Sequence, residues 1–268
     1  MTKRNRPAFF CLSSGSTSNC FYLGYKDYGI LIDAGLGIRK TLQLLEEHDI
    51  AINSIKAIFI THDHSDHIKA VAALGERRGI PVYATKATVE GINCRETITP
   101  KLESCVRYIQ KEEPITLGAF EVVAFALPHD AEDSVGYRVA VEDISFVFMT
   151  DLGHMPTTAL PYVRKATHLV IEANHDVEML RRNPKYAESL KERIISNHGH
   201  LSNVQTASYI EQYASDTISH IWLCHLSKEN NDPAIAHREV MKALDKRALN
   251  NVKLEVLHHG IESDYIYL

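Results

Sequence analysis

The most informative stretch of this chain reads Thr61-His62-Asp63-His64-Ser65-Asp66-His67. It follows a strand-like apolar run at residues 58–60 and precedes a helix-like segment at residues 68–74. In an extended strand end, alternate side chains point the same way, so His62 and His64 can bind one metal ion. Asp66 and His67, where the chain turns toward the helix, can bind a second ion. Affinity tags and disordered His-rich tracts lack such flanking elements, so the pattern predicts a site for two metal ions.

The arrangement HxHxDH resembles the signature of the metallo-β-lactamase superfamily. In that superfamily the remaining ligands follow in order: an Asp after an early strand, a single His, a bridging Asp and a late His. Residues of these types end apolar runs in the same order, at Asp33, His129, Asp151 and His225. The resemblance implies an α/β fold, the αββα sandwich, in which two mixed sheets pack face to face with helices outside and metal ligands at strand ends.

The resemblance also implies a role for each of these residues. One ion would be bound by His62, His64, His129 and Asp151, and the other by Asp66, His67, Asp151 and His225. Asp151 would bridge the two ions, because a carboxylate has two oxygens and a neutral imidazole cannot serve both. Asp33 can be read as a cap for a helix expected at residues 39–48, but in the superfamily it orients ligand histidines from behind. We favour that supporting role.

A loop rich in hydroxyl groups, residues 13–19, separates two strand-like segments near the start of the chain. Taken alone, such a loop is most simply a hairpin turn. The longer text SSGSTSNCFYLGYKDYGILIDAG, residues 13–35, resembles the opening of the WalJ/YycJ family of bacterial metallo-β-lactamase-fold nucleases. Ser18 stands where the family pattern usually has glycine. From this resemblance we assign Ser14, Ser16 and Asn19 to substrate binding.

A second cluster, Asn-His-Gly-His-Leu-Ser-Asn, occupies residues 197–203 directly before a helix expected at residues 204–213. The unpaired N–H groups at a helix N-terminus suit an anionic leaving group, and His200 and Ser202 lie there. Ser202 can equally cap the helix, and both roles can hold at once.

Three later motifs match the WalJ/YycJ family almost letter for letter: EANHD at 172–176, GHLSN at 199–203 and HLSKENN at 225–231. GHLS with a downstream HLS also resembles the tRNA 3′-processing endonucleases, in which the first His donates a proton. The resemblance implies that His200, oriented by Glu172, protonates the departing 3′-oxygen, while Asp66 holds the proton of the nucleophile. It adds Ser202, Ser227 and Asn230 to the substrate-binding residues.

The function implied is a dinuclear-metal phosphodiesterase, a 5′-to-3′ exonuclease on DNA, with RNA as a second substrate class. His and Asp ligands suit two zinc ions by default, and manganese or iron would fit them too. A thioesterase or lactonase could use the same site. Oxygen or nitric oxide reduction at a di-iron site is a third possibility, although such relatives usually carry Glu in place of His64.

Composition limits the fold more than the substrate. A chain of 268 residues with 45% hydrophobic residues can bury a large core, and no linker divides it, so we expect one domain over residues 1–268. The net charge of −5 gives no overall field for nucleic acid. The basic residues at 181–193 are read as a solvated helix face, or alternatively as a track for phosphates.

Cysteine usage and hydropathy bear on location. The five cysteines are an odd number without CxxC spacing, which argues against a disulfide framework or a Cys-type zinc site. The apolar run at residues 8–12 is too short for a signal peptide, and no run reaches transmembrane length. We therefore expect a cytoplasmic protein without a membrane partner. Oligomeric state is left open, and histidines such as His168 and His220 are read as core or surface residues.

Overall fold

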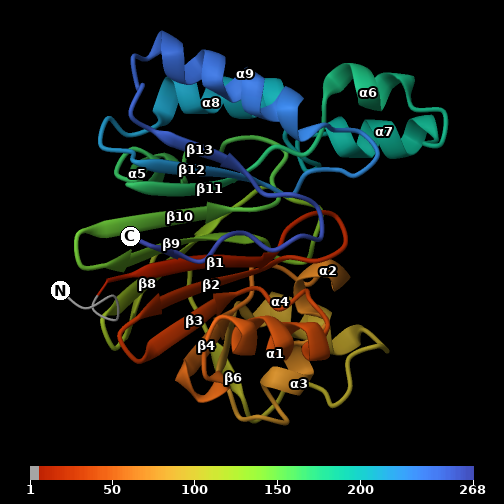
Figure 1. Cartoon of the computed structure of the whole chain (residues 1–268). Helices are drawn as coiled ribbons and strands as arrows, with labels where there is room; N and C mark the ends of the chain where they lie inside the picture. Colours follow the sequence, from red (N-terminus) through yellow and green to blue (C-terminus); the bar gives the residue numbers. More distant parts are fainter. Residues whose placement is uncertain (1–5) are drawn as a thin grey trace. The chain divides into compact units, whose positions relative to one another are not determined.

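The computed structural model describes residues 6–268, which form two compact units (Figure 1). Residues 6–113, together with 131–134 and 260–268, make the first unit, and residues 114–130 and 135–259 make the second. Each unit contains one seven-stranded mixed sheet with its own helices. This agrees with the expectation of two mixed sheets. Within residues 6–268, no helix is both long enough and apolar enough to cross a membrane.

The first unit begins with antiparallel strands and continues with parallel ones. Its strands, in sheet order, are β14 (Ile266–Tyr267), β1 (Ala8–Ser13), β2 (Cys20–Tyr25), β3 (Tyr28–Ile32), β4 (Ile55–Phe59), β5 (Val82–Ala84) and β6 (Val106–Tyr108). Its helices are α1 (Ile38–Glu47), the 3₁₀ helix η2 (Ile52–Ser54), α2 (Ser65–Ile68), α3 (Val71–Leu74) and α4 (Lys86–Cys94). Leu44 of α1, Leu74 of α3 and Val89 of α4 join Leu31 and Ile58 of the sheet in one buried core.

The second unit also combines an antiparallel half with a parallel half. Its strands, in sheet order, are β13 (Lys253–Val256), β12 (His220–Cys224), β11 (His168–Glu172), β10 (Ile144–Met149), β9 (Val135–Val141), β8 (Phe120–Ala126) and β7 (Pro114–Leu117). Its helices are α5 (Leu160–Val163), α6 (Val177–Arg182), α7 (Glu188–Ile195), α8 (Asn203–Tyr213) and α9 (Pro233–Lys246). Ile210 of α8 and Val240 of α9 pack on Leu169 and Ile221 of the sheet.

Strand direction brings polar residues together at one edge of each sheet. Because β3 and β4 are parallel neighbours, Asp33 after β3 lies beside the stretch 61–67 after β4. In the second unit β10, β11 and β12 are parallel, so three acidic and histidine residues share an edge. These are Asp151 after β10, Glu172 at the end of β11 and His225 after β12.

Candidate active site

In the first unit, the Asp33 carboxylate accepts hydrogen bonds from the stretch 61–67. Its Oδ1 accepts the Thr61 backbone N–H at 2.8 Å, and its Oδ2 accepts Nδ1–H of His67 at 2.7 Å. The Thr61 hydroxyl donates to Asp33 at 2.9 Å and lies 2.9 Å from His62 Nδ1. Burial raises the pKa of the Asp33 carboxyl, and its bonds from His67 and Thr61 oppose that effect. Because Nδ1 of both rings is engaged in this way, Nε2 is the nitrogen through which His62 and His67 would bind a metal. Nε2 of His67 lies 3.0 Å from Asn19 Nδ2 in this structure.

The predicted ligands of the first unit converge. The His62 ring centre is 4.7 Å from that of His64 and 4.1 Å from that of His67. His67 Nε2 lies 3.4 Å from Asp66 Oδ2. Histidine nitrogens and aspartate oxygens are donor types that zinc, manganese and iron accept.

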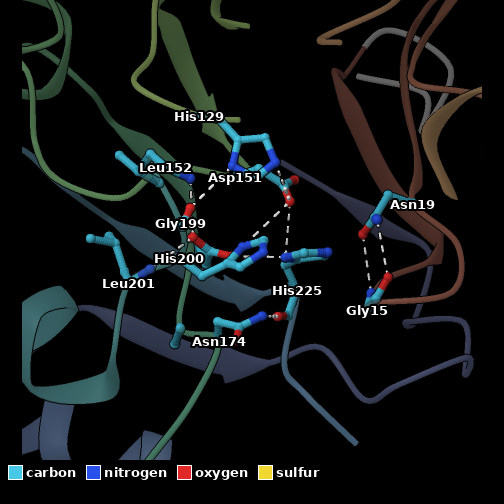
Figure 2. A network of polar contacts seen from close by, with 12 residues as sticks. Gly15, Asn19, His129, Asp151, Leu152, Asn174, Gly199, His200, Leu201 and His225 are labelled. Carbon is cyan, nitrogen blue, oxygen red and sulfur yellow. Dashed lines mark hydrogen bonds and ion pairs between the residues drawn. The ribbon is translucent and has the colours of Figure 1, made fainter. Parts of the chain in front are cut away.

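Two neighbouring loops are linked to this stretch by backbone hydrogen bonds. The Asn19 backbone N–H donates to the Asp66 carbonyl at 2.8 Å, and the Gly35 N–H donates to the Asn19 carbonyl at 2.8 Å. A Cβ on Gly35 would lie 1.5 Å from the Asp66 carbonyl oxygen, so only glycine fits there. The Asn19 side chain also bonds Gly15 in both directions (Figure 2) and lies 3.2 Å from Asp66 Oδ2. Asn19 therefore supports the proposed ligands directly.

In the second unit, the buried carboxylate of Glu172 organises the site. Its Oε1 accepts Nδ1–H of His200 at 2.7 Å and of His225 at 2.8 Å. Its Oε2 accepts the backbone N–H groups of Leu152 at 3.1 Å and Leu201 at 3.0 Å. Burial alone would raise the pKa of Glu172, but the two histidines and their hydrogen bonds hold it below its usual value. Glu172 is therefore an ionised acceptor for both rings.

Asp151 lies next to the same histidines (Figure 2). Its Oδ1 is 3.2 Å from His225 Nδ1, 3.7 Å from His200 Nδ1 and 3.8 Å from His129 Nε2. His129 Nδ1 donates to the Gly199 carbonyl at 3.1 Å, which leaves its Nε2 as the potential ligand. Asp151, Glu172, His200 and His225 each offer a ligand atom within 4.8 Å of the others. Of these four, the ligand set that the family resemblance implies uses Asp151 and His225, whereas Glu172 is hydrogen-bonded to the two histidines.

His200 has the surroundings of a proton donor. Its side chain is 22% exposed, so a substrate can reach it, and Nδ1 is held by Glu172. Burial alone would lower the pKa of His200, but the charge and hydrogen bond of Glu172 raise it above the usual value. One carboxylate thus orients the ring and favours its protonated form.

The residues assigned to substrate binding are mostly engaged within the protein. Ser202 caps α8 in a reciprocal capping box with Gln205. Ser227 Oγ accepts the Asn230 N–H at 3.2 Å, and Asn230 Oδ1 accepts Asn183 Nδ2–H at 2.6 Å. Of the six residues, Ser16 alone is exposed, while Ser14, Asn19, Ser202, Asn230 and the half-buried Ser227 are more enclosed. Their contact with substrate stays a prediction.

The five basic residues at 181–193 pair with four carboxylates, since Arg181 and Arg182 share Glu178. The ion pairs are Arg181–Glu178, Arg182–Glu178, Lys185–Glu229, Lys191–Glu188 and Arg193–Asp130. Because each cation faces a carboxylate, the stretch has little charge left for phosphates. The structure favours the solvated face.

Sequence reasoning missed several supporting groups. Thr61, which links Asp33 to two histidines, and Asn174, whose Nδ2 donates to the His225 carbonyl at 3.0 Å, were not singled out. Asp33 and His225 adopt left-handed φ values of 61° and 55°. Non-glycine residues rarely do so, and such strain concentrates at functional sites. No pattern in the sequence marks these conformations or the contact of the Gly199 carbonyl with His129.

Comparison with known proteins gives consistent matches. Residues 28–226 match the beta-lactamase superfamily domain. Exodeoxyribonuclease YycJ of Bacillus anthracis is 34% identical over 240 residues, 89% of each chain. Exodeoxyribonuclease WalJ of Streptococcus pneumoniae is 38% identical over 234 residues, 87% of this chain and 86% of the relative.

Solved structures agree with the fold. The metallo-beta-lactamase fold protein YhfI of Bacillus subtilis has a TM-score of 0.69 at 15% identity, covering 96% of this chain and 99% of that one. Zn²⁺-bound PqqB of Methylobacterium extorquens has a TM-score of 0.70 at 13% identity, with the same coverage. At such identities the likeness concerns the fold alone, and it confirms the predicted fold class.

Proposed function

Since this chain belongs to the beta-lactamase superfamily and to the family of the exodeoxyribonucleases YycJ and WalJ, we infer that it is a metal-dependent nuclease, and we propose DNA ends as its substrate. The observation that carries the proposal is the likeness to both enzymes along nearly the whole chain. The thioesterase or lactonase alternative is not favoured, because these relatives are named as nucleases.

We further propose two divalent metal ions, with zinc as the default and manganese or iron as alternatives. The first ion would be held by His62, His64, His129 and Asp151, and the second by Asp66, His67, Asp151 and His225. The Nδ1 contacts of His129 and His225 support this assignment, because each directs Nε2 away from its Nδ1 partner and toward an ion. Nε2 of His67 lies 3.0 Å from Asn19 Nδ2, so an ion there would replace that contact. Bound ions would neutralise charge on the phosphoryl oxygens and lower the pKa of water.

The chain's own residues supply the remaining chemistry. Glu172 orients His200 through Nδ1, so His200 Nε2 can carry a proton to the departing 3′-oxygen. Asp66 would hold the proton of the attacking water, and Asp33 would orient His67. We propose 5′-to-3′ polarity and a cytoplasmic location, the latter consistent with five cysteines that are all free thiols.

Metal-reconstituted protein incubated with 5′-labelled DNA, 5′-labelled RNA and a thioester panel tests the proposal. We expect metal-dependent release of the 5′ label as a mononucleotide from DNA at the first turnovers. Slower attack on RNA and no thioester hydrolysis should accompany it. Asp151→Ala, which removes the proposed bridging carboxylate, is the inactive control. Thioester hydrolysis without DNA cleavage would refute the nuclease assignment, and a ladder of shortened 5′-labelled products would refute the polarity.

A further inference from the structure

Asp63 is the acidic residue of the stretch 61–67 that the proposed metal site does not use. It stands between His62 and His64, and alternate side chains of an extended segment point to opposite sides. Its Oδ2 accepts Nη2–H of Arg95 at 2.8 Å, and its side chain is 8% exposed against 33% for Arg95. Asp63 thus turns away from the proposed ligands toward a partner of its own.

The ion pair joins the metal-binding stretch to helix α4. Arg95 is the C-cap residue directly after α4, and its backbone N–H donates to the Ile92 carbonyl. Gly91 of the same helix approaches so closely that an added Cβ would lie 3.0 Å from Asp63 Cγ. Asp63, Gly91 and Arg95 line an open pocket of about 360 Å³ together with Glu132. The absence of a side chain at Gly91 lets the carboxylate and the guanidinium meet.

The same carboxylate also fixes a second segment. Asp63 Oδ1 accepts the backbone N–H of Glu132 at 3.3 Å. Residues 131–134 belong to the first unit, and Thr88 of α4 holds them further by donating to the Asp133 carbonyl at 2.8 Å. Glu132 follows the proposed ligand His129 by three positions in the sequence. One carboxylate therefore bonds both Arg95, next to α4, and the segment that follows the proposed ligand His129 in the sequence.

We propose that Asp63 and Arg95 form a clamp that positions the stretch 61–67 for metal binding, an inference that rests on the proposed metal site. A partly buried ion pair with a directed hydrogen bond holds geometry better than an exposed one, and removing one partner leaves a charge that is hard to solvate. Neither residue is among the proposed ligands. Both are positioning residues, acting through His62 and His64.

The variants separate positioning from general stability. Arg95→Gln should weaken binding of the first ion by about 10–100-fold, the range for groups that orient ligands. Arg95→Lys, which keeps the charge but loses the planar fork, should recover part of this affinity. The double variant Arg95→Gln/Asp63→Asn should lose less Zn²⁺ affinity than the sum of the two single losses, because both substitutions break the same contact. Lys111→Gln is the matched control, since Lys111 pairs with Asp133 on the same 131–134 segment.

The readouts are Zn²⁺ affinity by chelator competition, the visible spectrum of the Co²⁺-loaded protein and thermal unfolding of metal-free protein. We expect weaker affinity and an altered Co²⁺ spectrum for Arg95→Gln, with Lys111→Gln like wild type. Wild-type affinity and spectrum in both Arg95 variants would overturn the clamp, as would equal losses in Arg95→Gln and Lys111→Gln. Should Arg95→Gln fail to fold, Arg95→Lys decides by the same criteria. No nucleic acid enters these measurements, so absent DNA cleavage by wild-type protein would refute the proposed function while leaving this result readable.

Discussion

His200 is the residue whose contacts speak most directly to chemistry. A proton donor matters in proportion to how poor the leaving group is, so His200→Ala should slow DNA cleavage by about 10²–10⁴-fold. The same change should barely affect a p-nitrophenyl phosphodiester, whose leaving group departs without a proton. Rates on both substrates, with metal content measured in parallel, check this. Equal losses on both at unchanged metal content would assign His200 to binding, and a normal rate on DNA would remove it from the mechanism.

Asp33 offers a second test at the residue scale. Asp33→Asn keeps the shape of the side chain but weakens the acceptor for His67 Nδ1. We expect metal to remain bound with affinity lower by about 10–100-fold. Chelator competition measures the change, and Asp27→Asn, at an exposed turn of the same unit, serves as control. Complete loss of metal would mean that Asp33 is itself a ligand.

His168 should make stability depend on pH. Burial, followed by the charge of His220, lowers its pKa from 6.5 to about 4. In the unfolded chain His168 binds a proton below about pH 6.5, whereas in the folded protein it does so only below about pH 4. The free energy of unfolding therefore falls as pH falls through this window. The loss should approach about 3 kcal/mol at pH 4. His168→Gln should show a shallower decline of Tm between these values than wild type or the half-buried control His237→Gln. Identical slopes would refute this account.

Some residue roles could be predicted from the sequence and others could not. The convergence of the side chains at 62, 64, 66 and 67 follows from local spacing, because strand and turn geometry fix where neighbouring side chains point. The family resemblance suggested the contact of His200 with Glu172, 28 positions away, but not that His225, 53 positions away, bonds the same carboxylate. That contact depends on the order of strands in the sheet, which no local pattern encodes. The same holds for Thr61 with Asp33.

Among the elements, helix α8 allows its cap to be tested apart from substrate binding. Ser202 Oγ accepts the Gln205 N–H, and Gln205 Oε1 accepts the Ser202 N–H at 2.9 Å. Ser202→Ala should lower the free energy of unfolding by about 1 kcal/mol, as loss of an N-cap usually does. Urea denaturation measures this, with the exposed Ser189→Ala of α7 as control, and we expect kcat on DNA to stay unchanged. Unaltered stability with a raised KM would make Ser202 a substrate contact instead.

The helix expected at residues 68–74 shows where element prediction fails. The structure has two short helices instead, Ser65–Ile68 and Val71–Leu74. In a continuous helix the Ala70 N–H would bond the Asp66 carbonyl. Here Ala70 bonds Ala34, and the Asp66 carbonyl accepts from Asn19. Distant loops therefore take over the backbone groups that helix continuation needs, whereas α8 nearly matches its expected range of 204–213 because its cap and its periodicity are local.

For the whole molecule, the charge balance and the domain count bear on function. The net charge is −5, and the basic residues of α6 and α7 are paired with carboxylates. Attraction for a phosphodiester must then come mainly from bound metal.

The superfamily match at 28–226 includes residues of both compact units. A single domain over residues 1–268 stays a prediction, and its residues 1–5 lie outside the described part of the chain.

Metal content is the property of the whole molecule that the proposed site predicts most sharply. We expect two ions per chain. Asp151→Ala should lose both ions, because Asp151 is the only proposed bridge between them. His225→Ala should mainly weaken binding of the second ion. Ions that bind only the folded chain stabilise it by about 2.7 kcal/mol at a free concentration 100 times Kd. Wild-type Tm should therefore fall on chelation, and Asp151→Ala should be insensitive to chelator. Elemental analysis and calorimetry with and without chelator provide both numbers. One tightly held ion, with no gain on adding Zn²⁺ or Mn²⁺, would refute the two-ion site, and a chelator-sensitive Asp151→Ala would refute the bridging role.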